Sequence, residues 1–320
     1  MARAINFKKL FKDAHIKTRD DPSRHWTHIN CPFCKNPVDT HFNGGFFSLK
    51  PAFNCFRCGV HSYYDAVSLA LNISIGETYK LLKSYDYIPE ETFEKKVAKA
   101  EHLDLPGYHL DENEKEYLRG RGFNVEYLES KFHIRGGGIA GDWSYRILIP
   151  IYFNHVLVSW TGRSILPKDV IEELGIPRYK NLSIEQSVIN SKEIFFNLDN
   201  CNGKEVILVE GPMDVLRGND NCICSLGTSV TREQELFLKN RFEKVFIAFD
   251  NEPAAQEKAK HLGMNLSSIG MSVEVVNICE DFYKDVWDED LKEFVKIQKN
   301  DPGELTEDEM NKVKKELGLL

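Results

Sequence analysis

Several broad classes of protein are excluded by features that this sequence lacks. No apolar run approaches the roughly 18 residues that a membrane-spanning helix needs, and the N-terminal segment has neither the apolar core nor the cleavage pattern of a secretory signal. No Gly-x-x-x-x-Gly-Lys-Ser/Thr phosphate loop is present, which excludes an ATPase motor of that type within these residues. The sequence also has no internal repeat and no low-complexity run. We therefore expect a globular protein of a reducing cytoplasm that has no membrane partner.

A uniform charge is also missing, because basic and acidic residues are separated along the chain. The sequence of 320 residues, long enough for two or three domains, has a net charge of −8. Residues 1–60 carry +6, whereas residues 201–320 carry −9. An acidic net charge argues weakly against a nucleic-acid-binding protein. An acidic segment can nevertheless lie on nucleic acid when divalent metal ions occupy its carboxylates.

Eight cysteines are present, and four of them form two closely spaced pairs. Cys31-Pro-Phe-Cys34 and Cys55-Phe-Arg-Cys58 are Cys-x-x-Cys motifs with 20 residues between them. Four thiolates at this spacing are typical of the tetrahedral structural site of a zinc ribbon. A redox pair or incidental cysteines would not account for two matching pairs. We therefore predict one structural zinc ion bound by these four cysteines, and we expect the nearby histidines not to be ligands.

The segment around these cysteines is basic and rich in aromatic residues. Aromatic side chains stack on unpaired bases, and lysine and arginine contact phosphates. Several phenylalanines could instead form the small core of the ribbon. The candidate contacts to a nucleic-acid template are Trp26, Lys35, Lys50 and Arg57.

From residue 205 onward, apolar strand patterns alternate with helical patterns. This alternation predicts an α/β domain whose mainly parallel sheet has helices on both faces. Ligands bind such sheets beyond the carboxyl ends of the strands. The apolar run 206–209 ends on Glu210, and the next run but one ends on Asp250, with Glu252 two residues later. We expect these three carboxylates to lie at one edge of the sheet.

Further acidic residues follow strands or begin helices in the same way. Asp214 lies one turn into the helix that Pro212 would begin, and the strand VEVVNI leads to Asp285 and Asp288. Carboxylates gathered at one edge repel one another and raise each other's pKa. Bound Mg²⁺ or Mn²⁺ would remove that penalty. Interaction with a helix dipole could explain any one of these acids, but it does not explain three clusters.

The order of these motifs resembles the Toprim fold that is shared by bacterial-type primases, topoisomerases and some nucleases. The resemblance rests on Glu210-Gly-Pro-Met-Asp214, Ser225-Leu-Gly-Thr228, Asp250-Asn-Glu252 and Lys284-Asp285. The ribbon resembles the zinc-binding domain of primases, most of all that of phage primases, and the motifs together cover about residues 24–290. Upstream segments single out the primases: 116–123, 146–151 followed by Gly162-Arg163, and 177–181 followed by Lys192.

The resemblance to primases implies synthesis of a short RNA on a single-stranded DNA template by two-metal nucleotidyl transfer. The core catalytic ligands would be Glu210, Asp250 and Glu252, and the other three strand-end acids would form a second tier of ligands. Basic residues of the upstream lobe would hold triphosphate or template, and a Gly-Thr pair would let backbone approach a phosphate. The candidates are Arg146, Arg163, Arg178, Lys180, Lys192, Gly227 and Thr228.

The resemblance also implies a domain order and a set of partners. The zinc domain would select the start site on the template. The expected partners are the DNA template, ribonucleoside triphosphates, a separately encoded replicative helicase and a single-stranded DNA-binding protein, as for a stand-alone phage primase in a host cytoplasm. We expect a zinc-ribbon domain (1–85), a linker (86–107), a mixed α+β basic lobe of an RNA polymerase domain (108–200), a Toprim catalytic domain (201–290) and a C-terminal helical tail (291–320).

The sequence departs from the primase pattern at several positions. Asn251 and Glu252 stand where the family has Gly and Asp, and Val286-Trp287 stands where a second Asp is usual, which leaves Asp288 as a candidate substitute. A Toprim nuclease would use the same acids without needing the basic lobe. A recombination-mediator DNA clamp also joins a zinc site to a Toprim fold, without needing the full acidic set. Retention of the three core acids favours catalysis over these alternatives.

Overall fold

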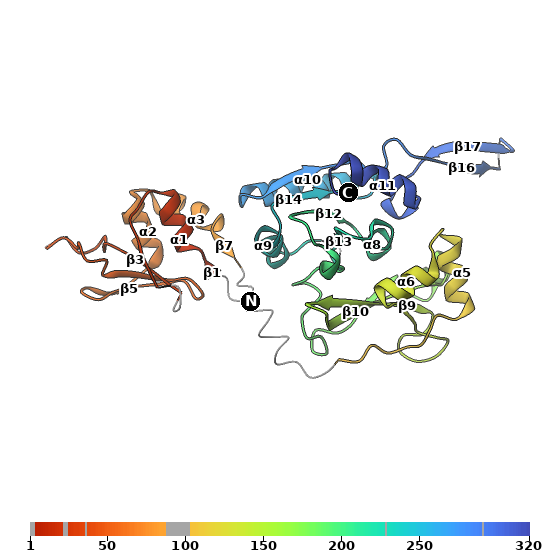
Figure 1. The fold of residues 1–320 in the computed structure, drawn as a ribbon, viewed down its shortest axis with the longest axis horizontal. Helices are drawn as coiled ribbons and strands as arrows, with labels where there is room; N and C mark the ends of the chain where they lie inside the picture. Colours follow the sequence, from red (N-terminus) through yellow and green to blue (C-terminus); the bar gives the residue numbers. More distant parts are fainter. Residues whose placement is uncertain (1–3, 22–24, 36, 88–102, 228, 290) are drawn as a thin grey trace. The chain divides into compact units, whose positions relative to one another are not determined.

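The computed structural model describes residues 4–21, 25–35, 37–87, 103–227, 229–289 and 291–320. The chain forms two compact units, Met1–Thr92 with Leu266–Gly270, and Phe93–Asn265 with Met271–Leu320 (Figure 1). The division at Thr92 falls within the predicted linker 86–107, of which residues 88–102 lie outside the described residues. Among the helices described, none is long and apolar enough to cross a membrane.

The first unit packs three helices against an antiparallel sheet. Aromatic residues of the first helix, Phe7 and Phe11, contact Phe46 of the sheet at ring-centroid distances of 4.8 and 4.9 Å. A Ser74–Glu77 capping box begins the third helix, as the sequence indicates. The sheet order is β2 (Arg19–Asp21), β3 (Trp26–Ile29), β4 (Gly44–Phe47), β5 (Ala52–Cys55) and β6 (Gly59–His61). The other elements are β1 (Ala4–Ile5), paired with β7 (Asp86–Tyr87), and helices α1 (Phe7–Asp13), α2 (Tyr63–Leu71) and α3 (Ile75–Lys83).

The second unit begins with an antiparallel sheet and short helices. Its two long strands are buried over most of their length, because both faces of the sheet are covered. Leu105, from the end of the predicted linker, is buried against Leu148 and Trp160 of this sheet. The sheet order is β11 (Tyr179–Asn181), β10 (Val156–Ser164), β9 (Arg146–Phe153) and β8 (Arg135–Gly136). The helices are α5 (Glu112–Gly120), α6 (Val125–Phe132), α7 (Lys168–Glu173) and the short η2 (Leu198–Asn200).

A four-stranded parallel sheet follows, which confirms the predicted α/β architecture. Its order is β13 (Cys222–Cys224), β12 (Glu205–Val209), β14 (Lys244–Ile247) and β15 (Ser272–Val275). Right-handed crossovers in this order place the first helix on one face and the other two on the opposite face. Residues 206–209 are fully buried, as expected of a strand covered on both sides. The helices are α8 (Pro212–Gly218), α9 (Arg232–Arg241) and α10 (Pro253–Ser268).

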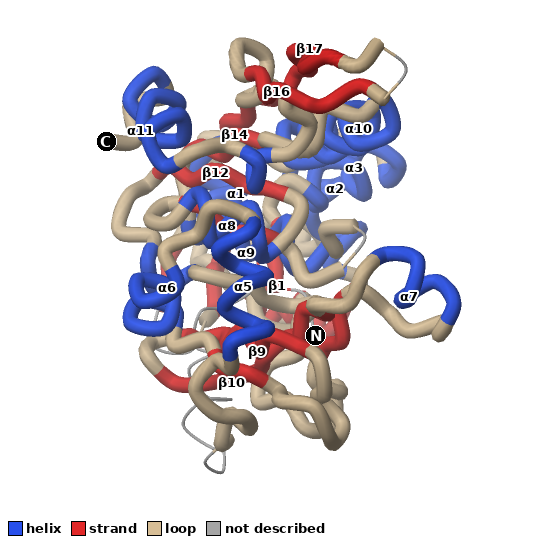
Figure 2. Tube along the Cα trace, turned by 90° about the vertical axis from the view of Figure 1, so that its right-hand side faces the viewer, coloured by secondary structure: helices blue, strands red, loops and turns tan. Residues whose placement is uncertain are grey.

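The C-terminal segment differs from the predicted helical tail. A hairpin of β16 (Tyr283–Asp288) and β17 (Glu293–Gln298) precedes η3 (Pro302–Glu304) and α11 (Glu307–Glu316) (Figures 1 and 2). Residues 293–298 are therefore a strand and not part of a helical tail. The capping box of Thr306 and Glu309 begins α11 as predicted. Both η3 and α11 pack against α8, so the chain returns from the hairpin to the parallel sheet.

The antiparallel sheet of the second unit contacts the carboxyl-terminal edge of the parallel sheet. The side-chain amide of Asn181 in β11 donates to the carbonyl of Leu226, just beyond β13, at 2.8 Å. Phe196 forms an antiparallel bridge with Cys224 at the end of β13. Residues of β11 therefore lie beside the strand ends where the predicted acidic site begins.

Candidate catalytic and zinc sites

Two neighbouring parallel strands bring the predicted core acids together. Glu210 follows β12, and Asp250 lies three residues beyond the end of β14. The two strands are paired, and the backbone N–H of Asp250 donates to a carboxylate oxygen of Glu210 at 3.4 Å. Prolines at the first positions of α8 and α10 turn the chain away directly after each acid. The prediction that these strands are neighbours is confirmed.

A third acidic segment, which sequence reasoning missed, completes the cluster. Asp301 precedes η3 and Glu304 ends it. The backbone N–H of Gly303 donates to Asp214 Oδ1 at 3.2 Å, which fixes η3 against the beginning of α8. A Cβ atom at Gly303 would lie 2.9 Å from carboxylate oxygens of both Asp214 and Asp301. Only glycine therefore allows this close approach.

The carboxylates of the cluster are crowded, and a divalent cation would relieve their mutual repulsion. Burial and the charges of Glu210, Asp301, Glu252 and Glu304 raise the pKa of Asp250 to about 7. Burial and Glu304 also raise the pKa of Asp301. One oxygen of each of these two aspartates is buried without a hydrogen-bond partner among the described residues. A cation with oxygen ligands would satisfy both atoms and relieve the repulsion.

The cluster is not a closed cage of ligands. Within the described residues, the four cysteines are the only group of three or more His, Cys, Asp or Glu whose ligand atoms all lie within 4.8 Å of one another. Mg²⁺ usually keeps several water molecules and binds one or two carboxylates together with substrate phosphates. The open arrangement of Glu210, Asp250, Glu252, Asp301 and Glu304 fits that mode of binding.

Asp214 has a different position from the one expected of a metal ligand. Its side chain is 8% exposed, and its two oxygens accept backbone N–H groups from Gly211 at 2.9 Å and Gly303 at 3.2 Å. Burial, Asp301 and Asp250 raise its pKa well above the ordinary value. Asp214 therefore holds the turn after Glu210 against η3, and each of its oxygens already accepts a backbone hydrogen bond.

The structure does not bring Asp285 or Asp288 to the cluster, which corrects the expectation for the third acidic segment. Both lie in β16, where Asp285 is opposite Lys296 and Asp288 accepts the backbone N–H of Leu291 in the hairpin turn. The carboxylates acting on Asp250 include Asp301 and Glu304 in their place. The physical reason is that the chain after β15 extends into a hairpin before it returns to the sheet edge.

Among the basic candidates, Arg163 lies close to the acidic cluster. Its guanidinium carbon is 5.9 Å from the Tyr117 ring centroid and 5.0 Å from that of Tyr179, and its Nε donates to the Tyr117 hydroxyl at 3.0 Å. The Tyr179 hydroxyl lies 3.8 Å from where a Cβ of Gly211 would be. These contacts hold Arg163 next to the turn that follows Glu210.

Arg146 is not available to a ligand, contrary to expectation. It is 5% exposed, and its guanidinium donates to the carbonyls of Gly162, Pro177 and Arg178 at 3.0, 2.9 and 3.4 Å. It therefore joins β9 to β10 and to the segment before β11. Burial lowers its pKa, yet an arginine remains charged.

The remaining nucleotide candidates differ in position. Lys180 donates to the carbonyl of Asp142 at 2.7 Å and lies 4.8 Å from the Trp143 ring centroid. Arg178 and Lys192 are exposed. Gly227 is exposed beyond β13, and Thr228 lies outside the described residues.

The four predicted zinc ligands meet in the first unit. Cys31 and Cys34 follow β3, Cys55 ends β5 and Cys58 precedes β6. The sulfurs of Cys31 and Cys58 lie 3.6 Å apart, and those of Cys34 and Cys55 lie 3.8 Å apart. A tetrahedron with Zn–S bonds of about 2.3 Å has edges of about 3.8 Å, so the donor set and its dimensions both fit zinc.

Asp39, which sequence reasoning missed, supports this site. It is 1% exposed and accepts the backbone N–H groups of Cys31, His41 and Asn43 at 2.7 to 2.9 Å. Burial opposes its ionisation, but these hydrogen bonds lower its pKa to about 2. His61 Nε2 lies 3.2 Å from the Cys58 sulfur, beside the four-cysteine group and not a member of it.

One face of the zinc-bearing sheet carries a row of rings. Trp26 lies 5.3 Å from Phe47 and 6.0 Å from His28, and His28 lies 5.9 Å from Phe56. A Cβ at Gly45 would lie 2.9 Å from the Trp26 and His28 rings, so this glycine lets the rings cross the strand. Of the predicted template contacts, Lys35 and Lys50 are exposed, and Arg57 donates to the carbonyl of Pro37 at 3.1 Å.

Comparisons with known proteins agree with this arrangement. The model of a Toprim-like family matches residues 207–291. The DNA primases of Staphylococcus aureus (strain COL) and Clostridium acetobutylicum are 26% and 25% identical over 131 and 168 residues. The uncharacterized protein MG010 of Mycoplasma genitalium is 30% identical over 172 residues, which cover 51% of this chain and 72% of that protein. The chain therefore belongs to the same family as MG010, and it is similar in sequence to DNA primases.

The matches differ in how much of each relative they cover. The alignments span 38% and 51% of this chain but only 20% and 28% of the two relatives named as DNA primases. The Aquifex aeolicus primase structure (zinc-binding and RNA polymerase domains) matches 98% of this chain and 83% of that chain, with 20% identity and a TM-score of 0.46. The primase fragment of the bacteriophage T7 primase-helicase matches 78% and 88%, with 16% identity and a TM-score of 0.38.

Proposed function

We propose that the protein is a DNA primase that synthesises short RNA primers on single-stranded DNA by two-metal nucleotidyl transfer. The observation that carries the proposal is Asp250, whose pKa is raised to about 7 among four other carboxylates and one of whose oxygens is buried with no partner among the residues that the structure describes. A divalent cation satisfies this arrangement, and phosphoryl transfer is the chemistry that such sites support. The match to Toprim-like proteins and the similarity to DNA primases favour this reaction.

The residues of the second unit would divide the work as follows. Glu210, Asp250 and Glu252, together with Asp301 and Glu304, would hold Mg²⁺ or Mn²⁺. When bound, these ions supply Lewis-acid stabilisation of the attacking 3′-oxygen and of the phosphates. Asp214 would hold these carboxylates in position, because it ties the turn after Glu210 to η3.

The basic lobe would contact the substrate from the other side of the site. Arg163 is held by Tyr117 and Tyr179 beside the Glu210 turn, where a guanidinium would meet phosphate. Lys180, Arg178 and Lys192 would contact the template backbone further away. Phosphoryl transfer depends mainly on such positioning and charge stabilisation.

The first unit would bind zinc and read the start site on the template. The row of Phe47, Trp26, His28 and Phe56 crosses one sheet face, and Phe56 is 71% exposed. Bases of a single strand stack on such rings, while nearby lysines contact the phosphates. His28 and Phe56 therefore extend the recognition set that the sequence indicates, which includes Trp26.

The proposal includes four more specific expectations about domains and partners. They are the domain order with a linker at 86–107, a separately encoded replicative helicase, a single-stranded DNA-binding protein as partner, and a stand-alone primase of phage type. A basic ribbon and an acidic catalytic segment support a division of labour between template recognition and metal-dependent synthesis.

Primer synthesis on mixed-sequence single-stranded DNA, with labelled ribonucleotides and Mg²⁺ or Mn²⁺, tests the proposal. Wild type should make short labelled RNA, and Glu210→Gln should make none. Cys55→Ser should fail to initiate but still extend a supplied primer. Cleavage of the DNA without RNA synthesis would establish a Toprim nuclease. Binding of DNA without either reaction, across templates that contain every trinucleotide, would favour a DNA clamp.

A further inference from the structure

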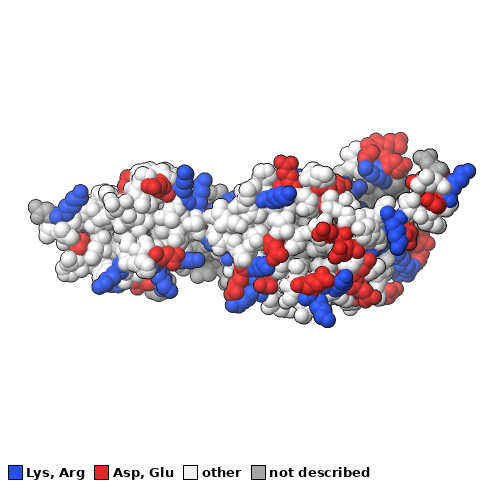
Figure 3. Space-filling model, turned by 90° about the horizontal axis from the view of Figure 1, so that it is seen from above, with Lys and Arg blue, Asp and Glu red and all other residues white. Residues whose placement is uncertain are grey.

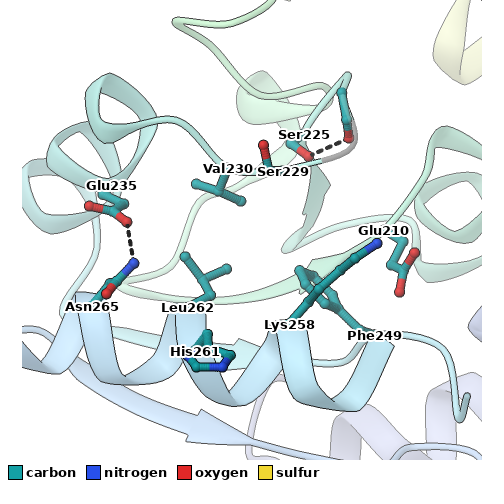
Figure 4. Close-up of a pocket in the computed structure, with 11 residues that line it drawn as sticks. Glu210, Ser225, Ser229, Val230, Glu235, Phe249, Lys258, His261, Leu262 and Asn265 are labelled. Carbon is teal, nitrogen blue, oxygen red and sulfur yellow. Dashed lines mark hydrogen bonds between the residues drawn. The ribbon is translucent and has the colours of Figure 1, made fainter. Parts of the chain in front are cut away.

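A cavity of about 450 Å³ opens beside Glu210, on the face of the parallel sheet that carries α9 and α10. Its walls are the turn after β13, α10 and part of α9 (Figure 4). Its volume lies within the range of roughly 300–1,000 Å³ that is usual for small-molecule sites. The polar lining residues near its mouth are Glu210, Ser225, Ser229, Lys258 and His261.

Lys258 is a cationic residue that lines this cavity and is not part of the acidic cluster. It lies on α10, and its extended side chain crosses the cavity on the side of Glu210 in Figure 4. It is exposed and has no ion pair or hydrogen bond within the part of the chain that the structure describes. An exposed, unpaired ammonium group next to a metal-binding carboxylate is well placed to contact a bound anion.

The other charges around the cavity are already compensated. Glu235 pairs with Arg232 at 2.9 Å and accepts the side-chain amide of Asn265 at 3.2 Å. Glu210 belongs to the cluster that would hold the divalent cation. With that cation bound, Lys258 leaves this end of the cavity favourable to a polyanion.

We propose that this cavity holds the polyphosphate of the incoming ribonucleotide and then the pyrophosphate product, with Lys258 as a direct contact. This inference rests on the proposed function, because the anion is a substrate of nucleotidyl transfer. In that reaction the 3′-hydroxyl loses its proton to solvent water, and its oxygen forms a bond to the α-phosphorus. The bond from the α-phosphorus to the bridging oxygen breaks, and pyrophosphate leaves with the electron pair. Lys258 would stabilise the charge that develops on this leaving group.

The turn after β13 gives the cavity room for phosphate oxygens. A Cβ atom at Gly227 would meet no atom closer than the carbonyl of Ser229, at 3.8 Å, so open space lies beside this backbone. The Ser225 hydroxyl is held by the Gly227 carbonyl at 3.3 Å. The backbone of Gly227, which lines the cavity, therefore borders space that a phosphate group can fill.

Two measurements test the assignment on wild type, Lys258→Ala, Lys258→Arg and Lys260→Ala. Lys260 is exposed on the same helix but does not line the cavity, which makes it the matched control. Calorimetric titration with inorganic pyrophosphate in Mn²⁺ gives the Kd directly. Extension of a supplied primer gives the KM for the ribonucleotide and the inhibition constant of pyrophosphate.

Loss of a charge-assisted contact to phosphate should weaken all three constants about 10- to 100-fold in Lys258→Ala. Lys258→Arg should recover most of the loss, and Lys260→Ala should stay within about twofold of wild type. Wild-type constants in a folded Lys258→Ala protein that still makes RNA would overturn the cavity assignment and leave the proposed function intact. Failure of wild type to make RNA would overturn the proposed function, and pyrophosphate binding would still report on the cavity by itself.

Discussion

Replacing Asp250 by asparagine should stabilise the metal-free protein. Burial and neighbouring carboxylates raise the pKa of Asp250 from 3.8 to about 7. The native state therefore holds this proton more tightly than the unfolded chain does, and stability falls as pH rises from about 4 to about 7. Above pH 7 the full penalty is present, and an isosteric amide removes it.

The expected size of the effect follows from the pKa shift. A shift of about three units corresponds to about 4 kcal/mol. Solvent screening of a partly exposed cluster reduces this to about 2 kcal/mol. For a unit of this size, 2 kcal/mol raises Tm by about 4 to 8 °C. The gain should be smaller at pH 5.5, where much of the native Asp250 is still protonated.

Thermal denaturation in magnesium-free buffer at pH 5.5 and pH 8 measures this gain. Asp285→Asn is the matched control, because its carboxylate lies in the hairpin away from the cluster and should give no change. Saturating Mg²⁺ should reverse the ranking, since a cation at 100 times its Kd stabilises wild type by about 2.7 kcal/mol. Equal stability of Asp250→Asn and wild type at pH 8, or a gain that is the same at both pH values, would refute the proposed crowding of carboxylates.

Three further predictions follow from the site geometry. Asp301→Asn should lower primer synthesis by more than about 100-fold, because even outer-shell partners of a metal contribute 10- to 100-fold, whereas Asp288→Asn should stay near wild type. Arg146→Ala should lower the free energy of unfolding by about 3 kcal/mol, because the substitution leaves buried carbonyls unpaired. Urea denaturation measures this loss. Unchanged stability together with a raised KM for the nucleotide would contradict the structural role of Arg146. Asp39→Ala should weaken zinc retention about 10- to 100-fold in a chelator competition without slowing extension of a supplied primer.

The strongest sequence signals were those in which spacing alone determines geometry. Two Cys-x-x-Cys pairs place four sulfurs together once a short sheet forms between them, and the structure has them within 4.8 Å. Glu210 and Asp250 were predictable because each ends an apolar run in an alternating strand–helix pattern. Parallel pairing of β12 with β14 then brings the two strand ends together. These features depend on local sequence and on one general property of parallel sheets.

The third acidic segment could not be located in the same way. After β15 the acids that the sequence offered as candidates are Asp285 and Asp288, but they lie in a strand of a hairpin. The chain returns to the sheet edge only at Asp301. The motif there, Asp-Pro-x-Glu, has an acid before a proline that begins a helical turn, as at Glu210 and α8. That shared pattern was the available signal.

Arg146 shows why the role of a basic residue at the beginning of a strand cannot be assigned from the sequence. The pattern RILIPIYF predicts a buried strand, but it does not say whether the first guanidinium reaches solvent. The carbonyls that accept its hydrogen bonds come from residues 16 to 32 positions away. Long-range pairing of β10 and β11 supplies them. Structural and ligand-binding arginines become distinguishable only when those partners are known.

Because charge is separated along the chain, the two units should differ in their electrostatic attraction to nucleic acid. Residues 1–60, at +6, attract phosphates without help, whereas residues 201–320, at −9, repel them. On the face drawn in Figure 3, most of the acidic side chains lie on the second unit. Under the proposed function, divalent cations on these carboxylates would let the acidic segment approach DNA and ribonucleotides. Because burial and neighbouring carboxylates raise the pKa of Asp250 to about 7, protons would compete with a metal ion at this site. Metal affinity, and with it any contact of the catalytic unit with nucleic acid, should rise with pH through about 7, while binding by the zinc-bearing unit should not depend on that titration.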